Sequence, residues 1–218
     1  MTRRPHKALQ LRKPVPATLA DGFPTSEIAA GTRYFRSFSK GNGPWYFNSS
    51  TAQRFNLPSP EGTCYVATDV LTAVLERLGE QLADGPISAD EIDRMHVASL
   101  ELQARVTSAL TGHKKAAAFG CNREICTTED YALTQEWASA FRALPVEAVS
   151  YESRLSSESK MNALALFGPE GDAGHPVRSQ LSGRNAMRHA GLSNLIAPSR
   201  PKGKTMKSLL APDPLRRP

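Results

Sequence analysis

The sequence predicts an α+β domain, and three features of the chain lead to that class. Short runs of β-favouring residues are mixed with a few amphipathic helical runs. These runs do not alternate regularly, as the strands and helices of a doubly wound α/β sheet do. The chain has 218 residues, of which 40% are hydrophobic and 22% charged, which is enough for one globular core with extensions.

The two ends of the chain differ in composition from its middle. Residues 1–26 are rich in arginine, lysine and proline, and they predict a basic, extended N-terminal arm. Between His175 and Pro218 nine Lys or Arg oppose a single acid, so this segment carries +8 while the whole chain carries +6. We therefore expect a central domain over residues 27–170 and a basic, flexible tail over residues 171–218.

The first strand is expected at Tyr34–Phe38, where aromatic and polar residues alternate. Arg33 and Arg36 lie in or beside this strand. A turn at Gly41–Pro44 then leads to three consecutive aromatic residues. Such a cluster fits either the core or the wall of a pocket that receives a flat ring. Its members are Trp45, Tyr46 and Phe47.

The run GTCYVATDVLTAVLE, residues 62–76, predicts a buried strand, a turn and a helix. Thr63–Ala67 is apolar and β-favouring, and Thr68 and Asp69 can both cap a helix. Glu76 lies opposite the apolar stripe on the helical wheel, so the residues alone favour a solvated surface glutamate. The apolar residues at helical spacing are Val70, Leu71, Val74, Leu75 and Leu78.

Three further elements are expected in the middle of the chain. Leu100–Val106 alternates apolar and polar residues, as a strand with one exposed face does. Leu110–Phe119 predicts a loop with a short helix. Thr127 or Thr128 can cap the next helix. The apolar stripe of that helix is Leu133, Trp137, Ala140 and Phe141.

Two short strands are expected next, at Val146–Tyr151 and Ala163–Phe167, with a serine-rich loop between them. The composition of this loop alone indicates a simple connection between strands and no specific function. After Gly168 the pattern ends, and only Met187–Ile196 predicts one or two helical turns.

Cysteine usage and hydropathy exclude several classes of protein. The three cysteines, Cys64, Cys121 and Cys126, are too few for a disulfide framework, and no nearby His completes a zinc set. Cys64 is expected to be a small buried hydrophobic side chain. No apolar run approaches the length of a membrane span, and no secretory signal follows the basic N-terminus. We expect a soluble cytoplasmic protein without a bound metal.

Three segments resemble the RES domain family, which is named for a functional Arg, Glu and Ser, and they occur in the family's order. They are Tyr34–Ala67, Gly120–Phe141 and Val149–Gly168, within a resemblance that covers roughly residues 31–168. It implies a mixed β-sheet core with flanking helices, similar to that of ADP-ribosyltransferases. One departure is Gln53-Arg54-Phe55, because the family usually has Gly-Arg-Phe at this point.

The resemblance further implies that NAD⁺ is a substrate, with no separate cofactor, and that Arg36, Glu76 and Ser153 are catalytic. Arg36 would hold a phosphate or the nicotinamide ribose, and Glu76 would face the scissile bond. Ser153 would hydrogen-bond nicotinamide or its ribose. The order Phe35-Arg36-Ser37 matches the family better than Arg33 does, although Arg33 stays a candidate. The Tyr-x-Ser setting of Ser153 distinguishes it from the neighbouring serines.

The residues expected to bind NAD⁺ are Arg36 and Ser153 together with Tyr46, Arg54 and Tyr65. The resemblance implies that Tyr46 and Tyr65 line the pocket, with Tyr65 stacked on nicotinamide, and that Arg54 is a second candidate for a phosphate contact. These residue types suit the ligand. A diphosphate pairs with planar guanidinium groups, and a cationic ring stacks on aromatic side chains. A carboxylate stabilises the positive charge that builds on the ribose during cleavage.

A member of this family is expected to be the toxin of a type II toxin–antitoxin system. It would cleave the nicotinamide–ribose bond of NAD⁺, as a glycohydrolase or phosphorylase, and its partner would be a cognate antitoxin. Two alternatives stay open. One is a protein ADP-ribosyltransferase that uses NAD⁺, and the other is a non-catalytic module that binds nucleic acid through the basic tail. The sequence does not decide between water, phosphate and a side chain as the acceptor, nor the oligomeric state.

Overall fold

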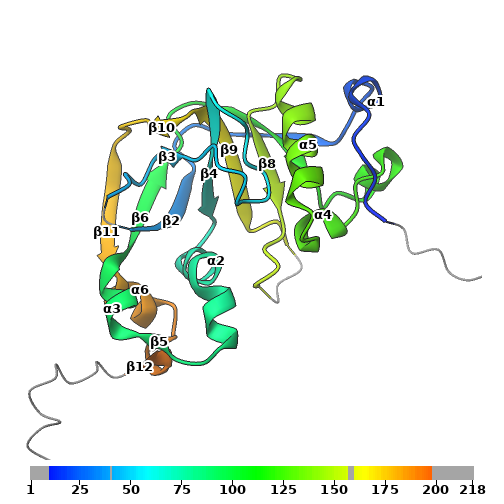
Figure 1. Cartoon of the computed structure of the whole chain (residues 1–218). Coiled ribbons are helices and arrows are strands. Elements are labelled where there is room, and N and C mark those ends of the chain that lie inside the picture. Colours follow the sequence, from blue (N-terminus) through cyan, green and yellow to red (C-terminus); the bar gives the residue numbers. More distant parts are fainter. Residues whose placement is uncertain (1–9, 40, 157–159, 198–218) are drawn as a thin grey trace, which may run out of the picture.

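The fold is built around one large mixed β-sheet with helices packed against it (Figure 1). The computed structural model describes residues 10–39, 41–156 and 160–197. Within these residues the large sheet has eight strands in the order β1-β7-β8-β9-β4-β2-β6-β11. Its neighbouring strands are antiparallel except β7 and β8, which are parallel. The α+β class and the mixed sheet expected from the sequence are therefore confirmed.

The elements have the following bounds. The strands of the large sheet are β1 (Thr25–Ile28), β2 (Arg33–Ser39), β4 (Glu61–Ala67), β6 (Met95–Glu101), β7 (Val106–Leu110), β8 (Ala148–Tyr151), β9 (Ala163–Pro169) and β11 (Val177–Ser182). Two small pairs are β3 (Tyr46–Phe47) with β10 (Gly171–Asp172), and β5 (Ile87–Ser88) with β12 (Ile196–Ala197). The helices are α1 (Pro16–Ala20), α2 (Val70–Ala83), α3 (Ala89–Arg94), η1 (Lys114–Phe119), α4 (Glu124–Thr127), α5 (Tyr131–Arg142), α6 (Gly183–His189) and η2 (Ser193–Leu195).

The sheet is split between β2 and β4. These two strands share a single register pair, Phe35 with Ala67, whereas β2 pairs with β6 and β4 pairs with β9 along their whole lengths. Beyond that pair, Asn48 takes the free edge of β4 through reciprocal backbone bonds with Thr63 of 3.0 and 2.9 Å. The segment around β3 therefore lies where β2 would otherwise continue, and the two halves of the sheet diverge.

Helices cover one face of each half. Behind β7, β8 and β9 lies a core cluster that contains Phe23, Trp137 and Phe141, with the two rings of α5 centred 5.6 Å apart. On the half that contains β2 and β6, α2, α3 and α6 bury a second cluster that includes Val74 and Met187.

The described part of the N-terminal arm packs on the domain rather than extending from it. Leu11, Leu19 and Phe23 are buried, and α1 contacts α5. The indole Nε1 of Trp137 donates to the backbone oxygen of Arg12 at 2.8 Å. The expectation of an extended arm was wrong for residues 10–26, because three apolar side chains in this basic segment find a core to fill. Residues 1–9 lie outside the described part.

The domain also continues beyond the expected boundary at residue 170. β11 pairs with β6 and forms the last strand of the large sheet, and α6 buries Ala186 and Met187. A flexible tail from residue 171 is therefore contradicted as far as residue 197. The apolar residues of this segment are few and spaced apart, so composition hid their contribution to the core. The most basic part of the expected tail, residues 198–218, lies outside the described residues.

The strand expected at Leu100–Val106 is in fact the end of β6, a short break, and the start of β7. Most of β6 is buried, including Val97, Ala98 and Leu100, because the sheet is covered on both faces at this strand. The apparent alternation of polar residues was produced by the connection between the strands. No helix in the described residues is long and apolar enough to cross a membrane.

Replacement of Met187 by Ala tests whether residues 171–197 belong to the domain. Met187 is fully buried, so we expect Met187→Ala to lower the free energy of unfolding by about 2–5 kcal/mol. The measurement is urea unfolding followed by circular dichroism. Val177→Ala is the control, since Val177 is 38% exposed, and its effect should stay below about 1 kcal/mol. Equal, small effects of both substitutions would contradict the inclusion of this segment.

Candidate active site

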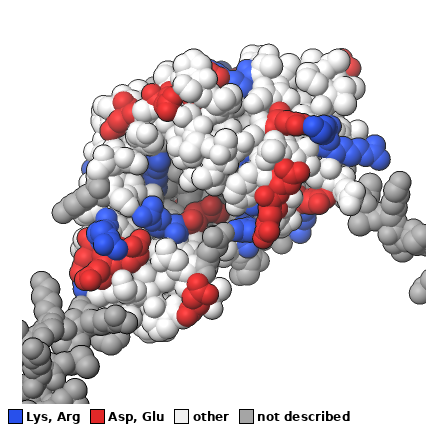
Figure 2. All heavy atoms as spheres, in the orientation of Figure 1, with Lys and Arg blue, Asp and Glu red and all other residues white. Residues whose placement is uncertain are grey.

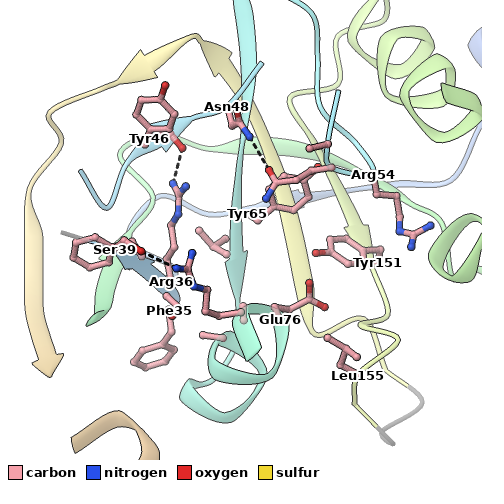
Figure 3. Close-up of a pocket in the computed structure, with 18 of the residues that line it drawn as sticks. Phe35, Arg36, Ser39, Tyr46, Asn48, Arg54, Tyr65, Glu76, Tyr151 and Leu155 are labelled. Carbon is pink, nitrogen blue, oxygen red and sulfur yellow. Dashed lines mark hydrogen bonds between the residues drawn. The ribbon is translucent and has the colours of Figure 1, made fainter. Parts of the chain in front are cut away.

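An open pocket of about 650 Å³ lies over the split in the sheet (Figure 3). Its walls come from β2, β4, α2, the segment 42–54, the start of α5 and the loop after β8. The space-filling view shows a hollow on this face, with basic and acidic atoms gathered at it (Figure 2). The volume is in the range of pockets that take a small-molecule ligand or cofactor.

Glu76 projects into this pocket from α2. The helix begins at Val70, where the side chain of Asp69 accepts a hydrogen bond of 2.8 Å from the backbone nitrogen of Thr72. Val70, Val74 and Leu78 are buried beneath the helix, so Glu76 on the opposite side is left accessible from the pocket. The expected stripe is narrower than predicted, since Leu71 is 42% exposed.

The surroundings of the Glu76 carboxyl group pull its pKa in two directions. Protein atoms crowd the group although it is open to solvent through the pocket, and this desolvation raises its pKa above the ordinary value. Hydrogen bonds from the side chains of Ser153 and Tyr151, and the charges of Arg54 and Arg154, oppose the rise. The net shift is upward, so Glu76 is a weaker acid than a glutamate in water.

Arg36 lines the pocket from β2, at the split in the sheet. Its Nη1 donates to the backbone oxygens of Pro44 and Tyr46 at 3.0 and 2.7 Å and contacts the sulfur of Cys64. Burial raises the pKa of the Cys64 thiol, which keeps it neutral beside the guanidinium. Cys64 is therefore a buried side chain, as expected, that also touches the arginine.

Arg36 and Arg33 differ in position. Arg36 lines the pocket, whereas Arg33 is exposed, stands opposite Glu101 in the strand register and does not line it. The geometry therefore favours Arg36 over Arg33 as the pocket arginine. The catalytic role expected for Arg36 stays a prediction.

Arg54 forms the opposite side of the pocket. Its Nη1 donates to the backbone oxygens of Thr128 and Ile125 at 2.5 and 3.3 Å, and its guanidinium lies over the ring of Tyr131, 5.1 Å from the centroid. The missing glycine at Gln53 leaves this loop unstrained, because none of the described residues other than glycines has a positive φ angle.

The two tyrosines expected in the pocket both line it, but the contacts they make are to the protein. The hydroxyl of Tyr65 accepts a hydrogen bond of 2.8 Å from the backbone nitrogen of Phe55, which holds the loop that carries Arg54. Tyr46 contributes its backbone oxygen to Arg36. Stacking of nicotinamide on Tyr65 stays a prediction.

Ser153 is placed differently from the expectation that it contacts the ligand. It is buried, 3% exposed, and it is not among the residues that line the pocket. Its hydroxyl accepts from the backbone nitrogen of Leu155 at 3.2 Å and faces the carboxyl group of Glu76. In this arrangement Ser153 hydrogen-bonds the carboxyl group of Glu76 from the protein interior rather than from the pocket.

Sequence reasoning missed several side chains that line the pocket, among them Arg77, Tyr131 and Tyr151. Tyr151 lies two residues before Ser153, and this spacing could have placed both beside one partner. Arg77 follows Glu76, and its Nη2 donates to the hydroxyl of Ser39 at 2.7 Å. Tyr131 had no signal of its own, because its role depends on the loop of Arg54, which is distant in the chain.

The side chains that could ligate a metal ion are not grouped in the described part of the fold. In the described ranges no group of three or more His, Cys, Asp or Glu side chains could hold a metal ion. Cys121 and Cys126 are free and buried, and burial raises the pKa of Cys121 to about 12. Among the described residues, the pocket therefore offers arginines, hydroxyl groups, side-chain amides, the thiol of Cys126 and one carboxyl group as its polar chemistry.

Comparisons with known proteins agree with the fold and extend it to a family. The family model of the RES domain matches residues 29–200. Among solved structures, a chain in the crystal structure of the M. tuberculosis MbcT–MbcA toxin–antitoxin complex aligns with a TM-score of 0.62 and 12% sequence identity, covering 81% of this chain and 97% of that one. No curated protein sequence matches the chain.

Replacement of Glu76 by Gln tests the raised pKa. The folded protein binds the proton of Glu76 more tightly than the unfolded chain, where the pKa is near 4.5. As pH rises past this value, ionisation of Glu76 therefore lowers stability in the wild type, and Glu76→Gln removes that loss. We expect Glu76→Gln to be more stable than wild type at about pH 7.5, with a smaller difference at about pH 4.

Urea unfolding at both pH values provides the measurement, with Glu129→Gln as control, because Glu129 is exposed and does not line the pocket. A stability difference between Glu76→Gln and wild type that does not change with pH would contradict the raised pKa.

Proposed function

The chain belongs to the RES domain family, and from this premise we propose that it is a toxin of a toxin–antitoxin pair that cleaves the nicotinamide–ribose bond of NAD⁺. The observation that carries the proposal is the position of Glu76. Its carboxyl group is accessible in a pocket whose opposite sides present Arg36 and Arg54. An acid between two cationic groups suits a substrate that carries a diphosphate and a scissile glycosidic bond.

The chemistry follows from the charge that develops during cleavage. When nicotinamide leaves, positive charge builds on the ribose, and a fixed carboxylate beside that carbon lowers the energy of the transition state. Arg36 and Arg54 are each held by backbone carbonyl oxygens, so they are already ordered before a diphosphate binds. Such preorganisation reduces the entropy lost on binding.

Glu76 must be ionised to act in this way. Tyr151 and Ser153 donate hydrogen bonds to it, and such bonds favour the charged form. They partly offset the desolvation that raises the pKa of the group. We infer that the two hydroxyl groups favour the ionised form of the acid and also fix its direction.

The pocket is compatible with more than one acceptor of the ADP-ribosyl group. Water would make the protein a glycohydrolase, phosphate a phosphorylase, and a side chain of another protein an ADP-ribosyltransferase. The three reactions share nicotinamide release and differ in the second product, so the mass of that product separates them.

The partner follows from the same proposal. The similar chain in the M. tuberculosis structure comes from a toxin–antitoxin complex, which supports a separate antitoxin chain as the partner here. The competing interpretation, a nucleic-acid-binding module, rests on basic residues that lie mostly in residues 198–218, outside the described part. The pocket favours the interpretation as an enzyme over that as a nucleic-acid-binding module.

Nicotinamide release tests the proposal directly. The purified protein, freed of any partner, is incubated with NAD⁺ beside Glu76→Gln and Arg36→Ala. We expect each substitution to lower kcat/KM about 100-fold or more, because each removes a charge needed at the transition state. Arg33→Ala is the matched control and should stay within about threefold, since Arg33 is exposed outside the pocket. A Glu76→Gln variant as active as the wild type would refute the role proposed for Glu76. A wild type that neither releases nicotinamide nor modifies protein would refute the proposal that the chain is an enzyme.

Removal of the Tyr151 hydroxyl group tests its support of Glu76. Tyr151→Phe loses a hydrogen bond to the ionised acid, so the pKa of Glu76 should rise further and kcat should fall about tenfold. Activity requires the carboxylate and declines as pH falls through this pKa, so the acidic limb of the kcat/KM profile should move to higher pH. Tyr34→Phe, a buried tyrosine outside the pocket, is the control. An unchanged acidic limb would show that Tyr151 does not act on the acid.

A further inference from the structure

A buried side chain behind the pocket, Asn162, connects the two segments that hold the acidic group. Asn162 lies immediately before β9, is 0% exposed and does not line the pocket. A buried amide lowers stability unless its polar atoms are hydrogen-bonded, so its contacts indicate what it does.

The first contact fixes Ser153. The side-chain oxygen of Asn162 accepts a hydrogen bond of 2.9 Å from the backbone nitrogen of Ser153, nine residues earlier in the chain. This bond closes the base of the loop between β8 and β9. It holds the backbone of the residue whose hydroxyl group faces Glu76.

The second contact fixes the start of α2. The backbone oxygen of Asn162 accepts a hydrogen bond of 3.0 Å from the backbone nitrogen of Thr68. Thr68 precedes Asp69, the capping residue of the helix that carries Glu76. A single residue therefore sets both the entry of the helix with the acid and the loop with the serine that supports it.

The third observation is an unpaired atom. The side-chain nitrogen of Asn162 has no hydrogen-bond partner among the described residues, although it is buried. An apolar side chain of similar volume would avoid that loss of hydration. Packing alone therefore does not account for an asparagine, whereas the need for an acceptor opposite the nitrogen of Ser153 does.

We propose that Asn162 is a positioning residue that holds Ser153, and through it the carboxyl group of Glu76, in the arrangement needed for bond cleavage. The catalytic part of this proposal rests on the proposed function. The structural part, the link from Asn162 to Ser153, does not. A small displacement of a reacting group is enough to lower a rate about 100-fold, so a link of this kind affects kcat without contacting the substrate.

Two substitutions of similar size separate positioning from packing. Asn162→Leu keeps the volume and removes the acceptor, whereas Asn162→Asp keeps an acceptor for the nitrogen of Ser153. We expect Asn162→Leu to lower kcat about 10- to 100-fold while KM changes less than about threefold. Asn162→Asp should recover most of the lost kcat. Hydrogen exchange of the Ser153 amide, resolved by NMR, should be at least about tenfold faster in Asn162→Leu and near wild type in Asn162→Asp.

A double-mutant cycle with Ser153→Ala tests the route of the effect. If Asn162 acts through Ser153, the two substitutions together lower kcat about as much as the larger single effect. Ser108→Ala is the control for the loss of a buried hydrogen bond, since its hydroxyl lies 2.7 Å from that of Ser150 and outside the pocket. It should lower stability without changing kcat.

Three outcomes would overturn the proposal: full kcat in Asn162→Leu, additive losses in the cycle, or unchanged exchange of the Ser153 amide. The amide exchange does not depend on activity. An inactive wild type would therefore refute the proposed function while the exchange still decides whether Asn162 holds Ser153.

Discussion

The contact of the Arg36 guanidinium with the segment around β3 is the interaction on which the site depends. Strands β2 and β4 separate after the pair Phe35–Ala67, and a separated pair of strands leaves backbone polar groups without partners. Arg36 extends from β2 and donates to the backbone oxygens of Pro44 and Tyr46, while Asn48 pairs with β4. The same contacts keep the sheet open and place a cation at the opening. The pocket is therefore a consequence of how the sheet is divided.

A second constraint is the balance around Glu76. Desolvation disfavours its charge, and hydroxyl groups and arginines from different segments favour it, with a net rise in its pKa. Tyr151 and Ser153 come from the end of β8 and the loop after it, and Asn162 joins that loop to the start of α2. This arrangement makes Glu76 less favourable for the stability of the fold than a surface glutamate would be. Such a loss of stability is common at functional sites.

Much of the fold could be predicted because it depends on local patterns. The strand, cap and helix of residues 62–83 follow from apolar spacing and from Asp69, and the strands at β8 and β9 follow from their apolar runs. The split sheet could not be predicted, since it depends on which strand pairs with β4. The contribution of Leu11 and Met187 to the core was missed because the apolar residues of their segments are few and separated by basic and polar ones. Within the site, family resemblance pointed to Glu76, which lines the pocket, while the position of Ser153 behind it, outside the pocket lining, required the tertiary structure.

The anchoring of the arginines to main-chain oxygens has a consequence for how the sequence can change over time. Arg36 is held by the carbonyl groups of Pro44 and Tyr46, and Arg54 by those of Ile125 and Thr128. Every amino acid supplies such a carbonyl, so substitutions at these four positions keep the acceptors as long as the backbone keeps its path. The positions of the two guanidinium groups therefore depend on the path of the backbone rather than on the identity of these four side chains.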